Sequence, residues 1–301
     1  MAPARSILSA CLLLPAFQQI AAAAAPAATG QFSFLTFNIN GLPGISNGVP
    51  GKKSDNHKTM GSKFAQYGYD VIHVQEDFNY HDDLYGADNH PHRTETSGGL
   101  FKGDGLNTLA NHPWEESTFS RSKWDECSDI NAADCFTPKG FTAMTMELAP
   151  GVLIDFYNVH ADASATEADL KARRDNIAQL AEFIQTNSAD RPVVIGGDSN
   201  MLYTREAETV KILTDLDFVD PWVELIMNGT APATGSSTPE CENPAEGLEC
   251  ETLDKIFYRP STAIDLQATY FNYETSKFLQ EDGSILSDHN PVTTNFYWTQ
   301  L

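Results

Sequence analysis

Ser287-Asp288-His289-Asn290-Pro291-Val292, near the end of the chain, places a carboxylate beside an imidazole. The apolar run that starts at Val292 and continues to Trp298 predicts a strand directly after this pair. An Asp-His pair at a strand entrance suits metal-assisted hydrolysis, because aspartate can hold a cation while histidine moves a proton near neutral pH. Such a pair also arises as an ordinary polar turn, so its meaning depends on the other residues that can meet it.

Polar side chains also mark the ends of five other predicted strands. One such residue usually only begins a loop, but these are all of the types used to hold hard cations and to transfer protons. A sheet brings strand ends together from distant parts of a chain, so the pattern predicts one shared site. The residues are Asn38, Glu76, His160, Asp198 with Asn200, and Asp254, at the ends of strands predicted for residues 31–39, 70–76, 152–160, 192–197 and 253–258.

The remaining periodicity predicts few helices among many strands. Ser164-Ala165-Thr166-Glu167 is a candidate capping box for a helix whose apolar face includes Leu170, Ile177 and Ile184. A second helix is expected over 204–216. Further strands are expected over 141–148, 263–270 and 292–298, while 82–140 and 228–252 look rich in loops. This pattern predicts stacked sheets flanked by helices.

The N-terminal segment has the composition of a signal peptide. Arg5 gives a positive start, residues 7–17 are mostly apolar, and five alanines occupy 21–25. The apolar part is too short for a stable transmembrane helix. We therefore expect residues 1–25 to be removed, leaving a secreted, extracellular protein with a single domain over residues 26–301, which is long enough to bury a large core.

Four cysteines would remain in the mature chain, in two local pairs. Cys127 and Cys135 form one pair, and Cys241 and Cys250 form the other. An oxidising compartment favours disulfides within such pairs. The alternative, a four-cysteine zinc site, lacks the short Cys-x-x-Cys spacing that is typical of one.

The chain is strongly acidic, with a formal net charge of −22 and a pI near 4.5. Such a surface repels polyanions, and no dense run of lysine and arginine provides the basic stripe that nucleic-acid binders usually carry. DNA or RNA is therefore a less favoured substrate. A bound cation can still reverse the sign of the charge locally.

The strand-end residues lie in motifs whose order resembles the endonuclease/exonuclease/phosphatase superfamily. This resemblance implies a four-layer αββα sandwich of the α/β (α+β) class, in which two mostly antiparallel sheets lie between helices, and metal-dependent cleavage of a phosphoester. The motifs are Thr36-Phe37-Asn38-Ile39, Val74-Gln75-Glu76, Asn158-Val159-His160, Gly197-Asp198-Ser199-Asn200, Leu253-Asp254-Lys255-Ile256 and the Asp288-His289 segment.

The resemblance also implies a role for each residue. Glu76 would be the main Mg²⁺ carboxylate, helped by Asn38 and Asp288, with Mn²⁺ or Ca²⁺ as alternative ions. His289 would be the general base and Asp254 would orient it. Asp198 and Asn200 would position the nucleophile and a phosphate oxygen, and His160 would donate to the phosphate or the leaving group.

The branch of the superfamily is less clear from the motifs. Leu42-Pro43-Gly44 and His160-Ala161-Asp162-Ala163 look like segments of sphingomyelinase or phospholipase C-like members. The stretch 37–42 resembles exonuclease III-like enzymes, but the lysine that those enzymes carry shortly after Gln-Glu is absent. We therefore expect a monomeric phosphodiesterase acting on a phospholipid headgroup such as sphingomyelin, at a membrane surface. A secreted DNase is the alternative, and a catalytically silent binding protein is the third.

Aromatic residues cluster in two segments that flank the predicted site in the sequence. They either pack under loops, which is the commoner arrangement, or form a rim that faces lipid. These residues are Phe78, Tyr80 and Tyr85 in one segment, and Trp114, Phe119 and Trp124 in the other.

Overall fold

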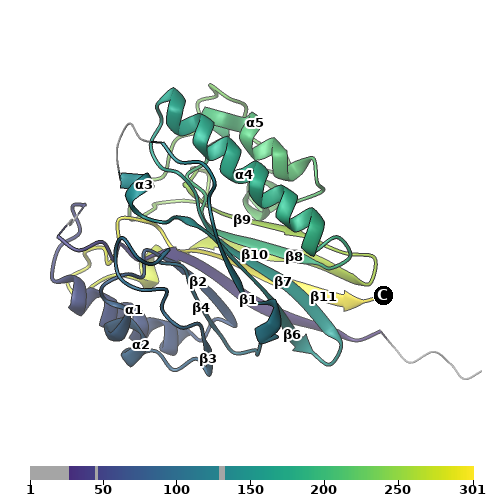
Figure 1. Ribbon diagram of the computed structural model, residues 1–301, viewed down its shortest axis with the longest axis horizontal. Coiled ribbons are helices and arrows are strands. Elements are labelled where there is room, and N and C mark those ends of the chain that lie inside the picture. Colours follow the sequence, from purple (N-terminus) through teal and green to yellow (C-terminus); the bar gives the residue numbers. More distant parts are fainter. Residues whose placement is uncertain (1–26, 45–46, 129–132) are drawn as a thin grey trace, which may run out of the picture.

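Two stacked β-sheets lie between two pairs of helices (Figure 1). The computed structural model describes residues 27–44, 47–128 and 133–301. The signal peptide predicted for residues 1–25 lies outside these residues. Figure 1 shows α4 (Glu167–Asn187) and α5 (Tyr203–Thr214) over one sheet, and α1 (Lys53–Tyr67) and α2 (His81–Ala87) beside the other. The predicted αββα sandwich is confirmed.

Each sheet contains one parallel pair of strands, and its other pairs are antiparallel. The six-stranded sheet has the order β10 (Ile264–Tyr273), β11 (Val292–Gln300), β1 (Thr29–Asn38), β2 (Val71–Gln75), β4 (Asn107–Ala110), β3 (His92–Arg93). The five-stranded sheet has the order β5 (Ser120–Lys123), β6 (Gly140–Ala149), β7 (Val152–His160), β8 (Val193–Asp198), β9 (Asp254–Arg259). The parallel pairs are β1–β2 and β7–β8, so both sheets are mostly antiparallel, as expected.

β1 is buried on both faces because it lies in the middle of the sandwich. Successive side chains of a strand point to opposite faces. Phe32 and Phe34 therefore join the core between the sheets, while Leu35 and Phe37 join a second core beneath α1 and α2. The first of these clusters of buried residues continues to the apolar face of α4, which covers the outer side of the five-stranded sheet (Figure 1). Burial on both sides explains why this strand carries large apolar residues on both of its faces.

Buried amides tie the two sheets together next to the polar strand ends. The Gln75 side chain donates from Nε2 to Asn158 Oδ1 across the interface at 2.7 Å. Asn158 in turn donates from Nδ2 to the carbonyl oxygens of Val74 and Asn107, both at 3.0 Å. Gln75 and Asn158 are fully buried, so each bond replaces one that water would otherwise make. The ties fix the separation of the sheets beside Glu76 and His160.

The helix that follows β7 begins two residues later than its predicted cap. Thr166 is the N-cap, its side chain accepts from Asp169 N, and Asp169 Oδ2 accepts from Thr166 N at 2.8 Å. The capping box thus runs from Thr166 to Asp169, and the prediction that placed it at Ser164 and Glu167 is wrong. Ser164 has φ 67° and belongs to the preceding loop.

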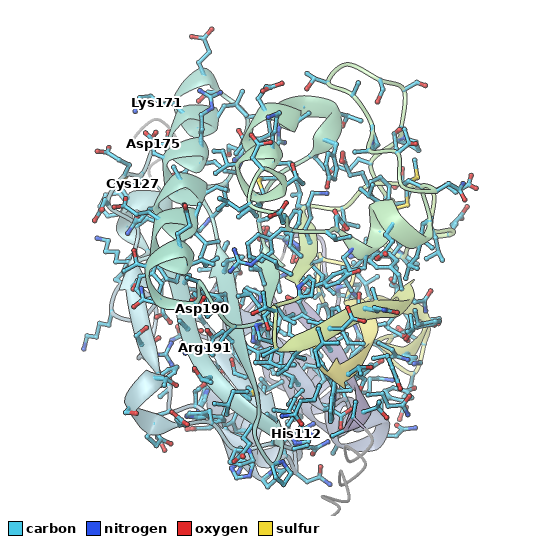
Figure 2. All side chains as sticks on the ribbon, turned by 90° about the vertical axis from the view of Figure 1, so that its right-hand side faces the viewer. His112, Cys127, Lys171, Asp175, Asp190 and Arg191 are labelled. Carbon is cyan, nitrogen blue, oxygen red and sulfur yellow. A yellow bond between two sulfur atoms is a disulfide. The ribbon has the colours of Figure 1, made fainter. Side chains whose placement is uncertain are left out.

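On the outer surface of α4, Lys171 and Asp175 form an exposed ion pair at 2.6 Å (Figure 2).

The smaller helical segments lie in the connections. They are α3 (Ala133–Phe136), α6 (Pro221–Leu225), and the 3₁₀ turns η1 (Glu116–Thr118) and η2 (Thr275–Lys277). Both predicted disulfides are present, Cys127–Cys135 before α3 ends and Cys241–Cys250 after α6. Among the helices of the described residues, none has the length and apolarity needed to cross a membrane.

His73 of β2 should make the fold sensitive to acid. Its ring is fully buried against Phe34, and Nδ1 lies 3.2 Å from Gly196 O. Burial lowers the pKa of His73 to about 3, so below pH 6.5 the unfolded chain binds a proton that the folded chain does not. The stability that neutral His73 provides is complete above pH 6.5 and is lost as the pH falls toward 3, by up to about 1.4 kcal/mol per pH unit.

His73→Leu should therefore flatten the pH dependence of stability. We expect a smaller slope of the unfolding free energy between pH 4.5 and 7 than in the wild type, whatever constant offset the lost packing adds. Urea titrations at several pH values measure both slopes. Parallel curves for the two proteins would contradict the assignment.

Candidate active site

The polar strand ends meet at one edge of the sandwich and come from both sheets. Asn38 ends β1 and Glu76 directly follows β2, which is paired in parallel with β1. In the other sheet His160, Asp198 and Asp254 are register partners across β7, β8 and β9. Asp288 and His289 precede β11 in the first sheet. The sequence separations between these residues are large, but the topology brings their side chains to one place.

Asn38 connects the two halves of this site. Its Nδ2 donates to Glu76 Oε1 at 3.2 Å and to Asp198 Oδ2 at 3.0 Å. Asn40 N donates to Asn38 Oδ1 at 3.0 Å, which fixes the orientation of the amide. The oxygen has a second lone pair, so this orientation is compatible with a bound cation.

His289 is held by two carboxylates. Its Nδ1 lies 2.7 Å from Asp254 Oδ2, and its Nε2 lies 3.8 Å from Asp198 Oδ2. Partial burial lowers the pKa of His289, but attraction to Asp254, Asp198 and Asp288 outweighs it and holds the pKa well above the usual value. Burial raises the pKa of Asp254 to about 6. Asp254 therefore accepts a hydrogen bond from the Nδ1 side of the ring and favours the protonated imidazole.

Asp198 lies between the two histidines. Its Oδ2 is 3.4 Å from His160 Nε2, and its Oδ1 accepts from Asn200 N at 3.1 Å. Burial raises the pKa of Asp198, but the charges of His289, His160 and Lys139 overcome this and hold the pKa below its ordinary value. Trp124 Nε1 donates to the backbone oxygen of His160 at 2.7 Å and anchors the end of β7. Asp198 is thus ionised and orients both imidazoles.

Glu76 is the residue under the greatest constraint. It adopts φ 61°, which is unusual for a residue with a side chain and is typical of functional sites. The chain after Asn38 packs against its backbone so closely that a Cβ on Gly41 would lie 2.0 Å from Glu76 O. Burial raises the pKa of Glu76, and Oε2 is buried without a hydrogen-bond partner in the described part of the chain. A buried carboxylate oxygen in this state fits a cation, which would supply the missing partner.

Two groups of side chains here have the chemistry to hold a cation. Oxygen and nitrogen atoms of Asp198, Asp254 and His289 lie within 4.8 Å of one another. These three are already joined to each other through the imidazole, whereas Glu76 offers an oxygen without a partner. Asp288 contributes further negative charge, and Asn47 Nδ2 donates to its Oδ2 at 2.7 Å. Because Mg²⁺ and Ca²⁺ bind oxygen atoms, the side of the site near Glu76 fits a hard cation better.

Two lysines at this site were not predicted from the sequence. Lys53, at the start of α1, donates from Nζ to Asn40 O at 2.5 Å and to Asn40 Oδ1 at 2.6 Å. Lys139 is buried, donates to Ala161 O at 3.3 Å, and favours the ionised forms of Glu76 and Asp198. Lys53 begins a helix and Lys139 is a cation beside β6, whereas the sequence pattern selected strand-end residues of the types that hold hard cations or transfer protons.

The aromatic segments do not form a lipid-facing rim as a group. Phe78 and Trp124 are buried, at 4% and 6% exposure, and Trp124 supports His160. The commoner arrangement, packing under loops, holds for these two.

A small cavity of about 90 Å³ adjoins the site. Asp254, Asp288 and His289 line it, together with Cys241 and its neighbour Glu240.

The chain matches a known family over most of its length. Residues 52–248 match Endonuclease/Exonuclease/phosphatase family 2. The chain belongs to this family. The resemblance inferred from the motifs is therefore confirmed, and the site described above lies in an endonuclease/exonuclease/phosphatase fold.

Individual relatives are consistent with this membership. A protein of Mycobacterium tuberculosis named sphingomyelinase is 34% identical over 278 residues, covering 90% of this chain and 53% of the relative. The chain therefore spans about half the length of the curated relatives it matches. The solved structure of sphingomyelinase C from Streptomyces griseocarneus has a TM-score of 0.58 at 19% identity, covering 88% of this chain and 99% of that one.

A protein that was solved with bound DNA has the same architecture. D. rerio TDP2, solved in complex with a single-strand DNA product, has a TM-score of 0.67 at 16% identity, covering 88% of this chain and 98% of that one. At these identities the structural likenesses show the fold alone, because one fold supports many functions.

Proposed function

We propose that this protein is a secreted, Mg²⁺-dependent phosphodiesterase that hydrolyses the headgroup of a phospholipid such as sphingomyelin. The observation that carries the proposal is the imidazole of His289, held on Nδ1 by buried Asp254 with Nε2 toward Asp198. Beside it lies Glu76, whose buried Oε2 has no hydrogen-bond partner among the described residues. A base held by a carboxylate next to a cation site is the arrangement that phosphoester hydrolysis needs.

Glu76, Asn38 and Asp288 would hold the cation. Glu76 supplies its buried Oε2, Asn38 supplies the remaining lone pair of Oδ1, and Asp288 lies at the half-buried side of the site. When bound, Mg²⁺ supplies positive charge that offsets the negative charge of the phosphoester and of the surrounding carboxylates. Lys53 and Lys139 add fixed positive charge to the same region.

The proton transfers fall to the two histidines. His289 accepts the proton of the attacking water at Nε2, because its Nδ1 is occupied by Asp254. The nearby carboxylates favour the protonated form of the His289 ring. His289 therefore acts as a base when positive charge in the site offsets the negative charge of these carboxylates. His160 donates toward the leaving group or a phosphate oxygen, and Asp198 and Asn200 orient the nucleophile between the two rings.

The choice of a lipid headgroup rests on the relatives and on the charge. The 34% identity to a protein named sphingomyelinase extends over most of this chain. The net charge of −22 disfavours a polyanionic substrate, whereas sphingomyelin is zwitterionic. Secretion is supported by the two disulfides, which form in oxidising compartments. We also propose that the protein acts as a monomer.

A substrate panel tests the proposal. We expect the purified protein with Mg²⁺ to release choline phosphate from sphingomyelin vesicles, and to do so much faster than it degrades plasmid DNA. Rapid DNA cleavage without lipid turnover would favour the DNase alternative. A protein that is inert toward sphingomyelin, DNA, RNA and inositol phosphates would be the silent binding protein instead.

A further inference from the structure

A cluster of one buried arginine, one half-buried arginine and one buried glutamate lies behind the site, between α4 and α5. Arg173 is fully buried, and its Nε donates to both carboxylate oxygens of Glu206, at 2.9 and 3.1 Å. Arg205 donates to Glu206 Oε1 from Nε at 3.1 Å and from Nη2 at 2.9 Å. Glu206 is itself only 7% exposed. One carboxylate therefore anchors both guanidinium groups.

Arg173 holds the loop that follows His160. Its Nη1 donates to Asp162 O at 2.6 Å and to Ser164 O at 3.1 Å. Ser164 has φ 67°, so the loop turns sharply where the arginine binds it. Since the loop begins one residue after β7 ends, its position limits where the His160 ring can lie.

Arg205 holds the loop that follows Asp198. Its Nη2 donates to the backbone oxygen of Asn200, which has φ 53°. Asn200 N donates to Asp198 Oδ1, and Asn200 Nδ2 donates to Ala161 O at 3.2 Å. The two loops are thus tied to each other and, through the arginines, to a single glutamate.

The helix is distorted where this glutamate lies. Glu206 has φ −149° and ψ 48°, which interrupts the helical geometry within α5. Here the interruption coincides with the residue whose carboxylate binds both arginines.

We propose that Glu206, Arg173 and Arg205 are positioning residues, which hold the loops after β7 and β8 so that His160 and Asn200 keep their places around Asp198. The inference rests on the proposed function and names residues that act on its site without touching substrate. Displacing a catalytic group by about 1 Å can lower a rate by about 10²-fold, so loosening either loop should reduce turnover.

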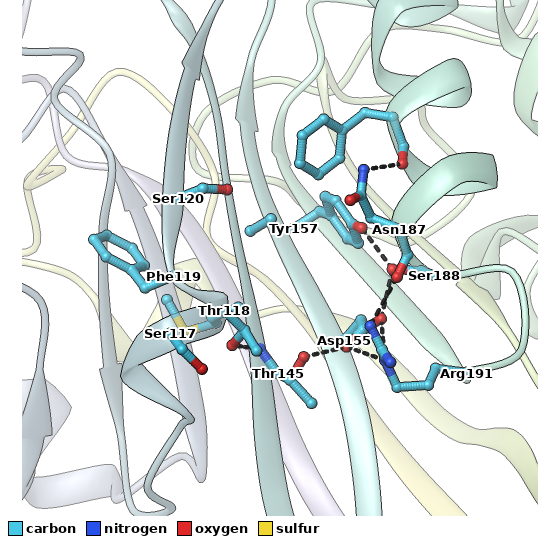
Figure 3. Close-up of a pocket in the computed structure, with 13 residues that line it drawn as sticks. Ser117, Thr118, Phe119, Ser120, Thr145, Asp155, Tyr157, Asn187, Ser188 and Arg191 are labelled. Carbon is cyan, nitrogen blue, oxygen red and sulfur yellow. Dashed lines mark hydrogen bonds and ion pairs between the residues drawn. The ribbon is translucent and has the colours of Figure 1, made fainter.

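A similar ion pair at the other end of β7 provides a matched control (Figure 3). Arg191 Nε binds Asp155 at 2.7 and 2.8 Å, and Asp155 also accepts from Thr145 and Ser188. Asp155 lies five residues before His160, about 16 Å along the strand. These groups line a pocket of about 340 Å³, larger than the one at His289, but their polar atoms bind one another. Loss of Arg191 should therefore affect stability and leave turnover unchanged.

The experiment compares Arg205→Ala with Arg191→Ala. For Arg205→Ala we expect kcat for bis-p-nitrophenyl phosphate to fall by about 10- to 100-fold with KM changed by less than about threefold. Millimolar ethylguanidinium should restore much of the lost kcat, because the Arg205 side chain is 25% exposed and its place is open to solvent. Arg191→Ala should keep wild-type kcat and show no response. Arg205→Lys and Glu206→Gln provide milder variants should the alanine protein not fold.

Wild-type kcat in Arg205→Ala would overturn the proposal, and so would a loss confined to KM or shared equally by Arg191→Ala. Hydrogen exchange separates this failure from that of the proposed function. Amides of residues 199–203 should exchange faster in Arg205→Ala and slow again with ethylguanidinium, whether or not a substrate is turned over. An inert wild type with this exchange pattern would refute the proposed function alone, and unchanged exchange would refute the positioning role.

Discussion

His289→Ala is expected to lower kcat for bis-p-nitrophenyl phosphate by about 10³-fold in the presence of Mg²⁺. The substitution removes the only imidazole that Asp254 binds in the described part of the chain, and it leaves the buried Asp254 and Asp198 carboxylates facing one another. The variant therefore lacks the group that we propose takes the proton of the attacking water. Turnover is measured by release of p-nitrophenolate at saturating substrate.

The loss must be separated from unfolding. His112→Ala is a matched control, because His112 follows β4 at the end of the sheet opposite Asn107, away from the site. It should retain wild-type activity. His289→Asn keeps a polar side chain near Asp254 but cannot act as a base, so it should be as inactive as the alanine variant while unfolding near the wild-type urea concentration. Substantial turnover in either His289 variant would refute the assignment of the base.

Glu76→Gln is expected to abolish the response to Mg²⁺. Glutamine keeps the size of the side chain but removes the charge whose Oε2 is buried without a partner, so the cation loses its main ligand. We expect kcat to fall by at least about 10²-fold and calorimetry to show Mg²⁺ binding weakened by at least tenfold. In EDTA the variant should melt at or above the wild-type temperature, because burial disfavours the Glu76 charge when no cation offsets it.

Thermal shifts separate binding from catalysis in this test. Mg²⁺ should raise the melting temperature of the wild type by mass action and should leave that of Glu76→Gln unchanged. Glu208→Gln, on the surface of α5, removes the same charge at a distance and should behave as wild type. Equal Mg²⁺ shifts in all three proteins would show that the cation binds elsewhere, for example at Asp198, Asp254 and His289.

Most strands could be predicted from the sequence because their apolar residues follow a clear pattern. β1 is apolar on both faces, and the hairpin of β6 and β7 has a clear turn, so length and composition were sufficient. α1 was not predicted. Its buried face contains Asn56, His57 and Gly61 beside Met60 and Phe64, which hides the helical period of apolar residues. No side chain caps its N-terminus, so the usual start signal is also missing.

The candidate site was predictable where its residues border an apolar strand, either at its end or at its start. Asn38, His160 and Asp198 lie at the ends of apolar runs, and the stacking of the sheets fixes the positions of these strand ends. Lys53 and Lys139 reach the site from a helix start and from the residue before β6, and only the packing of these segments directs their side chains inward. The cluster around Glu206 was missed for the same reason, since its contacts are to backbone oxygens of distant loops.

The amide ties between the sheets have a consequence for when activity can first appear. Gln75 and Asn158 join the sheets one and two residues from Glu76 and His160, so these two site residues come close together only when the two sheets dock. Neither half of the sandwich contains a working set of groups by itself. A nascent chain would therefore stay inert until the sheets dock, and the recovery of turnover during refolding would report that last docking step rather than the earlier formation of strands.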